Sequence, residues 1–377
     1  PFEMAETIAD DKITGNNETA ADHALAMVGF RTERGQKVNL QVASSFISIE
    51  QAELNLREIG GKSFDEVRTA CRDRWNQALG RISVSDSDVD RLRTFYSCLY
   101  RSLLFPRDLS EVNANGERVH YSPYNGEVKP GYMTTDTGFW DTFRSLFPLM
   151  NLVYPDQSVK VQEGLVNAYL ESGFLPEWAS PGHRGCMVGN NSASVVADAY
   201  VNGIRGYDAE KLWEAVISDA HKVHPEVSST GRLGWEYYDS LGYVPCNVGI
   251  KENAAPDGYC GDEDNGQTSA WYVFSAMGFY PVCPASGEFA VGTPLFKHVK
   301  VNMPSGKSFI VNAPENSNDN FYIRSMKVNG LEQTRTWLTY KELADGASVD
   351  FDMCSTPVTD RGTAVSDRPY SFSKESK

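Results

Sequence analysis

The residues best suited to chemistry lie in one short acidic run. Residues 258–272 read GYCGDEDNGQTSAWY, so Asp262, Glu263 and Asp264 stand in a glycine-flanked loop directly before a predicted helix, with Asn265 placed to cap it. The N-terminus of a helix carries partial positive charge and unpaired backbone N–H groups, so a carboxylate there favours its ionised form. Such a group suits a general base, or a ligand for a sugar or a cation, better than a general acid. An acidic capping turn without a ligand is the alternative.

A second cluster combines an aromatic ring with charges. Residues 138–144 read GFWDTFR, which predicts that Trp140 and Asp141 open a helix and that Arg144 lies one turn further on. An aromatic ring beside a carboxylate at the mouth of a helix can stack on a sugar ring and bind its hydroxyl groups. The alternative is a core tryptophan next to a structural Asp–Arg pair.

A third cluster lies in the loop between two apolar helices. It contains Pro176-Glu177-Trp178 and Gly182-His183-Arg184, and it ends at Asn190-Asn191-Ser192. Loops on a rigid helical scaffold are where binding sites are usually built. Loop capping is the alternative here.

Composition and motifs exclude several classes of protein. The 377 residues hold 35 basic and 50 acidic side chains, a net charge of −15, which argues against a nucleic-acid partner. No apolar run approaches the roughly 20 residues of a membrane span, and residues 1–20 show no secretory signal. GxGxxG after a strand, GxxxxGK[ST], HExxH and GxSxG are absent. Clustered carboxylates with abundant Trp and Tyr fit carbohydrate chemistry.

The cysteines do not predict a metal site or a disulfide framework. All seven are widely spaced, without a CxxC pair or a Cys/His cluster of zinc-like spacing. We expect most of them to be small buried hydrophobic residues.

The elements that must position these clusters follow the order β, α, β. Alternating apolar residues predict a strand within 37–50, and apolar residues at 3–4 spacing predict the helices that follow. A capping box, Ser63 to Glu66, opens the first helix. The predicted helices are 64–79, 88–105, 140–153, 156–172, 191–204, 208–221 and 267–278. After Pro281, alternation and turn signals predict an antiparallel β-sandwich.

At these clusters the sequence resembles glycoside hydrolase family 92, the exo-acting α-mannosidases. The segments that carry the resemblance are GFWDTFRSLFPL (138–149), MVGNNSASVVADAYVNGI (187–204), GRLGWEYYDSLGYVP (231–245) and GYCGDEDNGQTSAWYVFSAMGFYPVCPASGEF (258–289). Weaker similarity extends to FYSCLYRSLLFP (95–106) and PYSFS (369–373), so that most of the chain is covered.

The resemblance implies an α+β multidomain fold with β-sandwich elements beside an (α/α)6 toroid. It implies a sandwich remnant at 1–50, a helical linker at 51–87, an incomplete toroid at 88–285 and a C-terminal β domain at 286–377. It also implies calcium-dependent, inverting hydrolysis of terminal α-mannosides in glycans, by a monomer exported to the periplasm or the exterior.

The resemblance also implies roles for individual residues. Asp264 matches the general base and Asp262 its carboxylate partner, and Trp140 and Asp141 match the segment that lines the mannose subsite. We add Arg144 and Glu263 as substrate-binding candidates, because they adjoin these residues.

The chain departs from the family pattern at one junction. Residues 244–253, VPCNVGIKEN, run almost directly into the Ala255-Pro-Asp-Gly258 turn, where family members continue through further toroid helices. Those helices carry the general-acid Glu and a Gly-Asn-Glu segment that binds sugar and calcium. The resemblance therefore predicts an internal deletion and a truncated N-terminal sandwich, impaired catalysis, and unknown metal ligands. A non-catalytic sugar-binding protein and a purely structural fragment are the alternatives.

Overall fold

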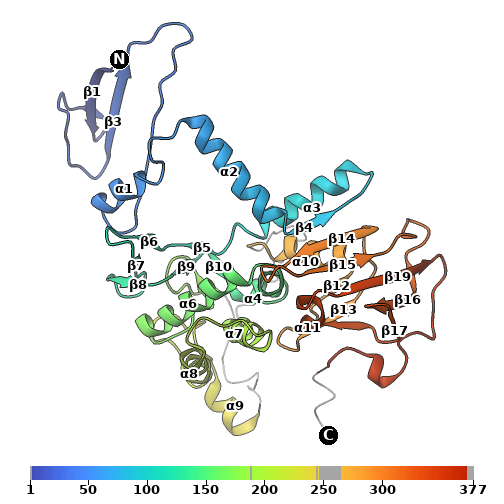
Figure 1. Cartoon of the computed structure of the whole chain (residues 1–377). Coiled ribbons are helices and arrows are strands. Elements are labelled where there is room, and N and C mark those ends of the chain that lie inside the picture. Colours follow the sequence, from blue (N-terminus) through green and yellow to red (C-terminus); the bar gives the residue numbers. More distant parts are fainter. Residues whose placement is uncertain (1, 187–188, 243–244, 246–264, 372–377) are drawn as a thin grey trace.

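The structure, a computed structural model, describes residues 2–186, 189–242, 245 and 265–371. The chain forms a mixed α+β protein in which an N-terminal β segment leads through helices to a C-terminal group of sheets (Figure 1). Within the described part of the chain, no helix has both the length and the apolar character that crossing a bilayer requires. The positions of Asp262, Glu263 and Asp264 lie outside the described residues.

The N-terminal segment is a small three-stranded sheet that stands apart from the rest (Figure 1). Its strands are β1 (Phe2–Ala9), β2 (Lys12–Ile13) and β3 (Ala24–Phe30), all antiparallel. The strand predicted within 37–50 is wrong, because residues 37–48 form no strand. Leu40 is 84% exposed there, so the alternating apolar pattern has no neighbouring strand to pair with.

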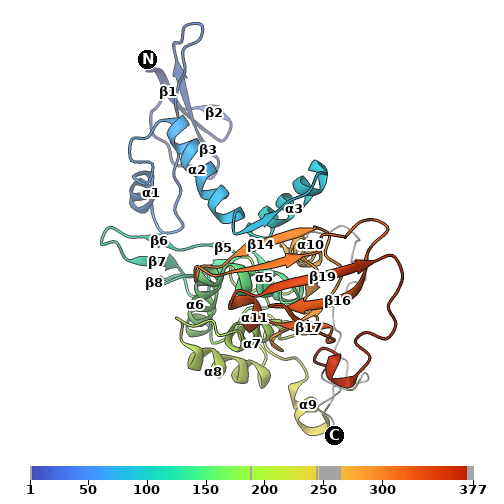
Figure 2. The ribbon, with the colours of Figure 1, turned by 45° about the vertical axis from the view of Figure 1, so that its right-hand side comes forward.

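Two helices connect this segment to the body: α1 (Ile49–Leu56) and α2 (Phe64–Leu79). The predicted capping box of α2 is confirmed, since Ser63 Oγ accepts from the Glu66 N–H and the Glu66 side chain accepts from the Ser63 N–H. No residue of α2 is buried, and Figure 2 shows the helix as a projecting rod. The C-terminal end of α2 contacts the body, where Leu79 packs against the core and the Trp75 ring lies 4.6 Å from the Tyr100 ring.

The next helix, α3 (Val89–Arg101), buries Phe95 and Leu99 and ends four residues before the predicted position. The following segment, where no helix or strand is among the predicted elements, contains short strand pairs beside α6. They are β5 (Arg107–Asp108), β6 (Glu111–Val112), β7 (Arg118–Tyr121), β8 (Val128–Pro130), β9 (Thr134–Thr135) and β10 (Thr137–Gly138).

The helix predicted over 140–153 is two helices, α4 (Phe139–Thr142) and α5 (Leu146–Val153). Pro148 lies in the first turn of α5, and a proline ring would clash with the carbonyl four residues earlier if one helix ran through. The Gln267 side chain also accepts hydrogen bonds from the Ser145 and Leu146 N–H groups, which stabilises a new N-terminus there. All eight residues of α5 are buried.

Further helices form the middle of the molecule, close to the predicted bounds. They are α6 (Pro155–Ser172), α7 (Asn191–Val201), α8 (Ala209–Ala220) and α10 (Gln267–Met277). A further helix, α9 (Trp235–Leu241), lies where none of the predicted helices falls. The short strand β11 (Trp178–Ala179) lies in the loop before α7. Helix α10 packs against α3 and α5, and its predicted end at Gly278 is confirmed by the left-handed φ of +92°.

The C-terminal part contains two sheets whose buried side chains share one core with the helices. The larger has the strand order β17-β16-β19-β15-β14-β4 and the smaller β12-β13-β18. The bounds are β4 (Ile82–Val84), β12 (Phe279–Tyr280), β13 (Glu288–Val291), β14 (His298–Asn302), β15 (Ser308–Asn312), β16 (Tyr322–Val328), β17 (Leu331–Gln333), β18 (Trp337–Thr339) and β19 (Ser348–Cys354), with α11 (Tyr340–Ala344) between the last two.

The prediction of antiparallel strands holds except at one place. β15 and β19 pair in parallel, because the chain between them makes the β16–β17 hairpin and α11 before it returns. The predicted apolar alternation is confirmed, since Val299, Val301, Phe309 and Val311 are fully buried. The other edge strand of this sheet, β4, comes from a distant part of the sequence and pairs with β14.

Candidate functional site

Trp140 and Asp141 lie side by side in α4, where the chain leaves β10. Trp140 is 42% exposed, so it is not the core tryptophan of the alternative interpretation, whereas Asp141 is buried. The guanidinium of Arg144 lies over the Trp140 ring, 5.0 Å from its centroid. The Arg144 cation and the exposed Trp140 ring are therefore in contact, and the buried Asp141 follows Trp140 directly in the chain.

A short β pair fixes the start of α4. β10 and β11 pair antiparallel, with Gly138 opposite Trp178. A Cβ on Gly138 would lie 2.2 Å from the Trp178 ring, so only glycine permits this approach. The Trp178 ring thus packs directly on the backbone that carries Trp140 and Asp141.

Glu177 connects this β pair to the N-terminus of α7. Its carboxylate accepts from the Asn191 N–H at 2.7 Å and from the Ser192 hydroxyl at 2.6 Å, and its backbone carbonyl accepts from the Phe139 N–H at 3.0 Å. The side chain is 1% exposed. Burial raises the pKa of Glu177 to about 8, against the lowering effect of these hydrogen bonds.

The geometry of Glu177 excludes the role of an exposed proton donor. One carboxylate oxygen accepts from Asn191 and the other from Ser192, and the group is closed off from solvent. The capping interpretation of the third cluster is therefore confirmed for Glu177, Asn191 and Ser192. Asn190, the residue before them, has a buried Oδ1 without a hydrogen-bond partner among the described residues.

The rest of the loop between α6 and α7 is also held by hydrogen bonds. The Arg184 N–H donates to the Trp178 carbonyl at 3.0 Å, and His183 Nε2 lies 3.0 Å from Ser172 Oγ. Burial and the nearby His224 lower the pKa of His183 to about 4, so its imidazole is neutral at pH 7. His183 thus anchors the loop without adding charge.

Cys186 also lies in this loop, close enough to Asp141 of α4 for that carboxylate to affect the pKa of the thiol. The thiol is exposed, and its pKa is raised first by partial burial and then by the negative charge of Asp141. The expectation that most cysteines are buried is wrong for the five that the structure describes. Cys71 and Cys186 are exposed and only Cys354 is buried, because Cys71 lies on α2, where no residue is buried, and Cys186 in a surface loop.

The predicted catalytic pair, Asp262 and Asp264, and the binding candidate Glu263 lie outside the described residues. The structure describes the chain again from Asn265, and Gln267 is three positions after Asp264. Gln267 Oε1 accepts from the Ser145 N–H at 3.0 Å, and the Ser145 hydroxyl donates to the Gln267 carbonyl. Gln267 is thereby attached to the residue directly after Arg144. Sequence reasoning missed Gln267, since nothing local links it to a residue 122 positions away.

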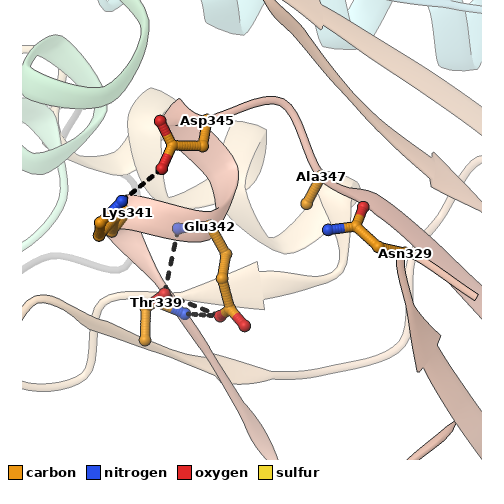
Figure 3. A pocket seen from close by; sticks show the side chains of 6 residues that line it. All are labelled: Asn329, Thr339, Lys341, Glu342, Asp345 and Ala347. Carbon is orange, nitrogen blue, oxygen red and sulfur yellow. Dashed lines mark hydrogen bonds and ion pairs between the residues drawn. The ribbon is translucent and has the colours of Figure 1, made fainter. Parts of the chain in front are cut away.

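A separate pocket lies beside α11, and its polar groups serve the fold. It has a volume of about 310 Å³ and is lined by Asn329, Thr339, Lys341, Glu342, Asp345 and Ala347 (Figure 3). Thr339 and Glu342 form a reciprocal capping box. Asp345 pairs with Lys341 at 2.6 Å and with Lys307 at 2.8 Å, and these hydrogen bonds lower the pKa of Asp345 to about 2. Lys341 and Asp345 are thus already paired with each other, and Glu342 pairs with Arg335.

The residues described do not supply an evident calcium site. No group of three or more His, Cys, Asp or Glu side chains lies together in the described ranges. Calcium requires six to eight oxygen ligands, with carboxylates prominent among them. The described side chains therefore do not fit a calcium ion by themselves.

An exposed indole beside a buried carboxylate, on a helical scaffold joined to β-sheets, is the kind of site that carbohydrate-active proteins use. The family model of the glycosyl hydrolase family 92 catalytic domain matches residues 51–255 and 250–355. The chain therefore belongs to glycoside hydrolase family 92.

Individual relatives agree with this assignment. An inverting mannosidase of family GH92 from Bacteroides thetaiotaomicron superposes with a TM-score of 0.91 at 34% identity, over 99% of this chain and 74% of that one. A GH92 α-mannosidase of the same organism, 19% identical, shares the fold with a TM-score of 0.83, over 98% and 71% of the two chains.

A curated relative is much longer than this chain. A protein described as an uncharacterized secreted glycosidase of Arthroderma benhamiae is 31% identical over 216 residues, which are 55% of this chain and 23% of that protein. The chain thus spans less than a quarter of that relative.

Proposed function

We propose that the chain carries a pocket of α-mannosidase type that binds a terminal α-linked mannose. One observation carries the proposal: Trp140 exposes its ring beside the buried carboxylate of Asp141, at the start of α4. The similar structure at 34% identity is named as an inverting mannosidase, which supports mannose as the sugar. Trp140 stacks on the pyranose, Asp141 accepts from its hydroxyl groups, and Arg144 holds the indole and adds positive charge.

Asp264 acts as general base in this proposal, with Asp262 as its carboxylate partner and Glu263 as a further contact to substrate. Inversion requires a base that activates water and an acid that protonates the leaving oxygen, with the two carboxyl groups about 6.5–9.5 Å apart. The attachment of Gln267 to Ser145 supports this assignment, because it ties the segment after Asp264 to the chain next to Arg144.

We further propose that hydrolysis is impaired. The two matches to the family model meet at residues 250–255, which supports a junction where other members carry the acid-bearing helices. Glu177 does not replace the missing acid, since it is buried and its two oxygens accept hydrogen bonds. Loss of a general acid alone reduces the rate by about 10²–10⁴-fold.

The same proposal covers cofactor, architecture and location. Calcium is the ion expected for the family, but the described side chains do not by themselves fit it. We propose an incomplete (α/α)6 toroid at 88–285, between a sandwich remnant at 1–50 with its linker at 51–87 and a β domain at 286–377. The secreted description of the curated relative supports an exported location, periplasmic or extracellular. There the protein acts as a monomer on mannose-containing glycans.

Hydrolysis of an α-1,2-linked mannobiose, measured by mannose release with and without calcium, tests the proposal. We expect release far below the roughly 1–10³ s⁻¹ that is typical of enzymes. Turnover in that range that is abolished by Asp264→Ala would refute impairment. Calorimetric or NMR titration with mannose then tests the pocket, and we expect saturable binding that Asp141→Asn weakens.

A structural fragment without any site is the second candidate. Large apolar side chains that are exposed in the described part favour it, among them Leu40 at 84%, Phe64 at 72% and Trp213 at 66%. This candidate predicts strong binding of a hydrophobic dye and no saturable shift with mannose. A saturable mannose shift would exclude it.

A further inference from the structure

We propose that Glu177 is the positioning residue of the sugar pocket, holding Trp140 and Asp141 in place without touching the sugar. The inference rests on the proposed function, because it assigns a role within that pocket. Three segments meet at this residue: the start of α4, the β10–β11 pair and the N-terminus of α7.

First, the backbone of Glu177 is hydrogen-bonded to the start of α4. Its carbonyl accepts from the Phe139 N–H, one residue before Trp140. Residue 178 then packs its ring on Gly138 from a distance that only a glycine allows, so that the β pair and α4 share one position. A shift of residues 177–178 must therefore move the backbone of Trp140 and Asp141.

The second step is the side chain. The carboxylate accepts from the Asn191 N–H and from the Ser192 N–H and hydroxyl, at the first two positions of α7. Those N–H groups have no partner within the helix, so the carboxylate is the group that ties residue 177 to α7. Helix α7 is an inner element, with Val195 and Ala199 buried in the described core. The Glu177 side chain therefore fixes residue 177, and with it the start of α4, to a helix that packs in the core.

The third step concerns the direction of the hydrogen bonds. An amide at residue 177 keeps the size of the side chain but turns an NH₂ donor toward the backbone N–H of either Asn191 or Ser192, which cannot accept a hydrogen bond, whereas the Ser192 hydroxyl can. At least one of the hydrogen bonds is then lost, and a buried donor is left unpaired. Glu177→Gln is thus a nearly isosteric change that cuts this connection.

Two measurements test the positioning role of Glu177. The first is the dissociation constant for mannose, measured by NMR titration, which we expect to rise about tenfold in Glu177→Gln because a displaced pocket loses its alignment. The second needs no sugar: the rate at which iodoacetamide alkylates Cys186, followed by peptide mass spectrometry. Partial burial and, after it, the charge of Asp141 raise the pKa of the Cys186 thiol, so displacement of Asp141 lets a larger fraction of the thiol ionise and the alkylation rate should rise.

Asp198→Asn is the matched control. Asp198 is another buried acid and lies within α7, the helix whose N-terminus Glu177 contacts. Its carboxylate also accepts hydrogen bonds from backbone and amide groups. We expect it to lower the melting temperature as Glu177→Gln does, with mannose affinity and Cys186 alkylation within twofold of wild type. Ser192→Ala, which removes one of the three hydrogen bonds, supplies a milder variant in case Glu177→Gln does not fold, and both readouts should move in the same direction by a smaller factor.

Each outcome of these experiments either supports or overturns the positioning role of Glu177. A folded Glu177→Gln protein with wild-type Cys186 alkylation and mannose affinity overturns the proposal, and so does Asp198→Asn if it changes both readouts equally. If Glu177→Gln does not fold, unchanged readouts in Ser192→Ala overturn it. Absence of mannose binding in the wild type would contradict the proposed function instead. The Cys186 alkylation rates would then still test whether Glu177 positions Asp141.

Discussion

Glu177, which contacts the N-terminus of α7, and Asp198, which lies within α7, are both buried. They differ in the segments of the chain that their side chains fix. Glu177 is 1% and Asp198 3% exposed, and burial raises the pKa of both. Asp198 accepts from Asn151 Nδ2, Asn202 Nδ2 and the Ala285 N–H, all within the packed interior between helices and the β part. Glu177 instead anchors backbone that leads to the exposed ring of Trp140.

The comparison shows that burial and a raised pKa do not by themselves identify a functional site. The informative feature is the segment that the carboxylate fixes. At Asp198 that segment is core, and at Glu177 it is the rim of the proposed pocket. Four further variants test this distinction.

The largest expected effect is on stability, in Asp198→Ala. The change leaves the three donors of Asn151, Asn202 and Ala285 without their acceptor, and each unsatisfied buried donor costs about 1–3 kcal/mol. We expect the free energy of unfolding, measured by urea titration, to fall by about 3 kcal/mol or more. Mannose affinity of the folded fraction should stay unchanged, and a loss of affinity would contradict the separation of the two carboxylates.

Trp140→Ala tests the other side of the comparison. Removing an aromatic contact from a binding site commonly costs about 2 kcal/mol, so the dissociation constant for mannose should rise at least about tenfold. Trp213, which is 66% exposed on α8, is the matched control. Equal binding by Trp140→Ala and Trp213→Ala would place the sugar elsewhere.

A buried ion pair formed by residues other than Trp140, Asp141 and Glu177 sharpens the comparison through pH. His120 in β7 lies 2.9 Å from Glu171 of α6, and its Nδ1 lies 3.0 Å from the Gly131 carbonyl. Burial lowers the pKa of His120, but its hydrogen bonds and the charges of Glu171 and Asp108 outweigh burial, so that the pKa is raised.

Because the folded state binds this proton more tightly, the stabilisation is complete below the unfolded pKa of about 6.5 and is lost as pH rises through the higher folded value. We expect the urea midpoint of the wild type to fall across this window and that of His120→Gln to fall less. A steeper fall in His120→Gln than in the wild type would show that the pair does not act this way.

The smallest effect is expected at an ordinary helix cap. Asp208 caps α8 by accepting from the Lys211 N–H at 2.8 Å, on an exposed surface. Asp208→Ala should lower the free energy of unfolding by about 1 kcal/mol, without any change in Cys186 alkylation. A larger loss than in Glu177→Gln would mean that Glu177 contributes no more than a cap does.

Local signals predicted much of the fold. The Ser63–Glu66 capping box and the Gly278 terminus depend on neighbouring residues only, and both are confirmed. The strand within 37–50 was wrong because a strand needs a partner, and the sequence pattern does not show whether one is present. The break between α4 and α5 depends on Pro148, a local signal, and also on Gln267, which is remote in sequence.

The candidate site was predicted in part. Trp140, Asp141 and Arg144 adjoin in the chain, and their proximity follows from a single turn. The role of Glu177 was not accessible, since residue types reveal a capping group but not the segment that it fixes. Asp262, Glu263 and Asp264 stay predictions, because they lie outside the described residues.

The edge strand β4 has a consequence for how the chain is made. Val84 pairs with Val299, which is 299 − 84 = 215 positions later. During synthesis the segment around Ile82 therefore emerges from the ribosome long before its partner exists, with an apolar side chain that is completely covered in the finished protein. The helices cannot mature as an independent unit in the order of translation, and a chain stopped before residue 298 should depend on chaperones or be degraded.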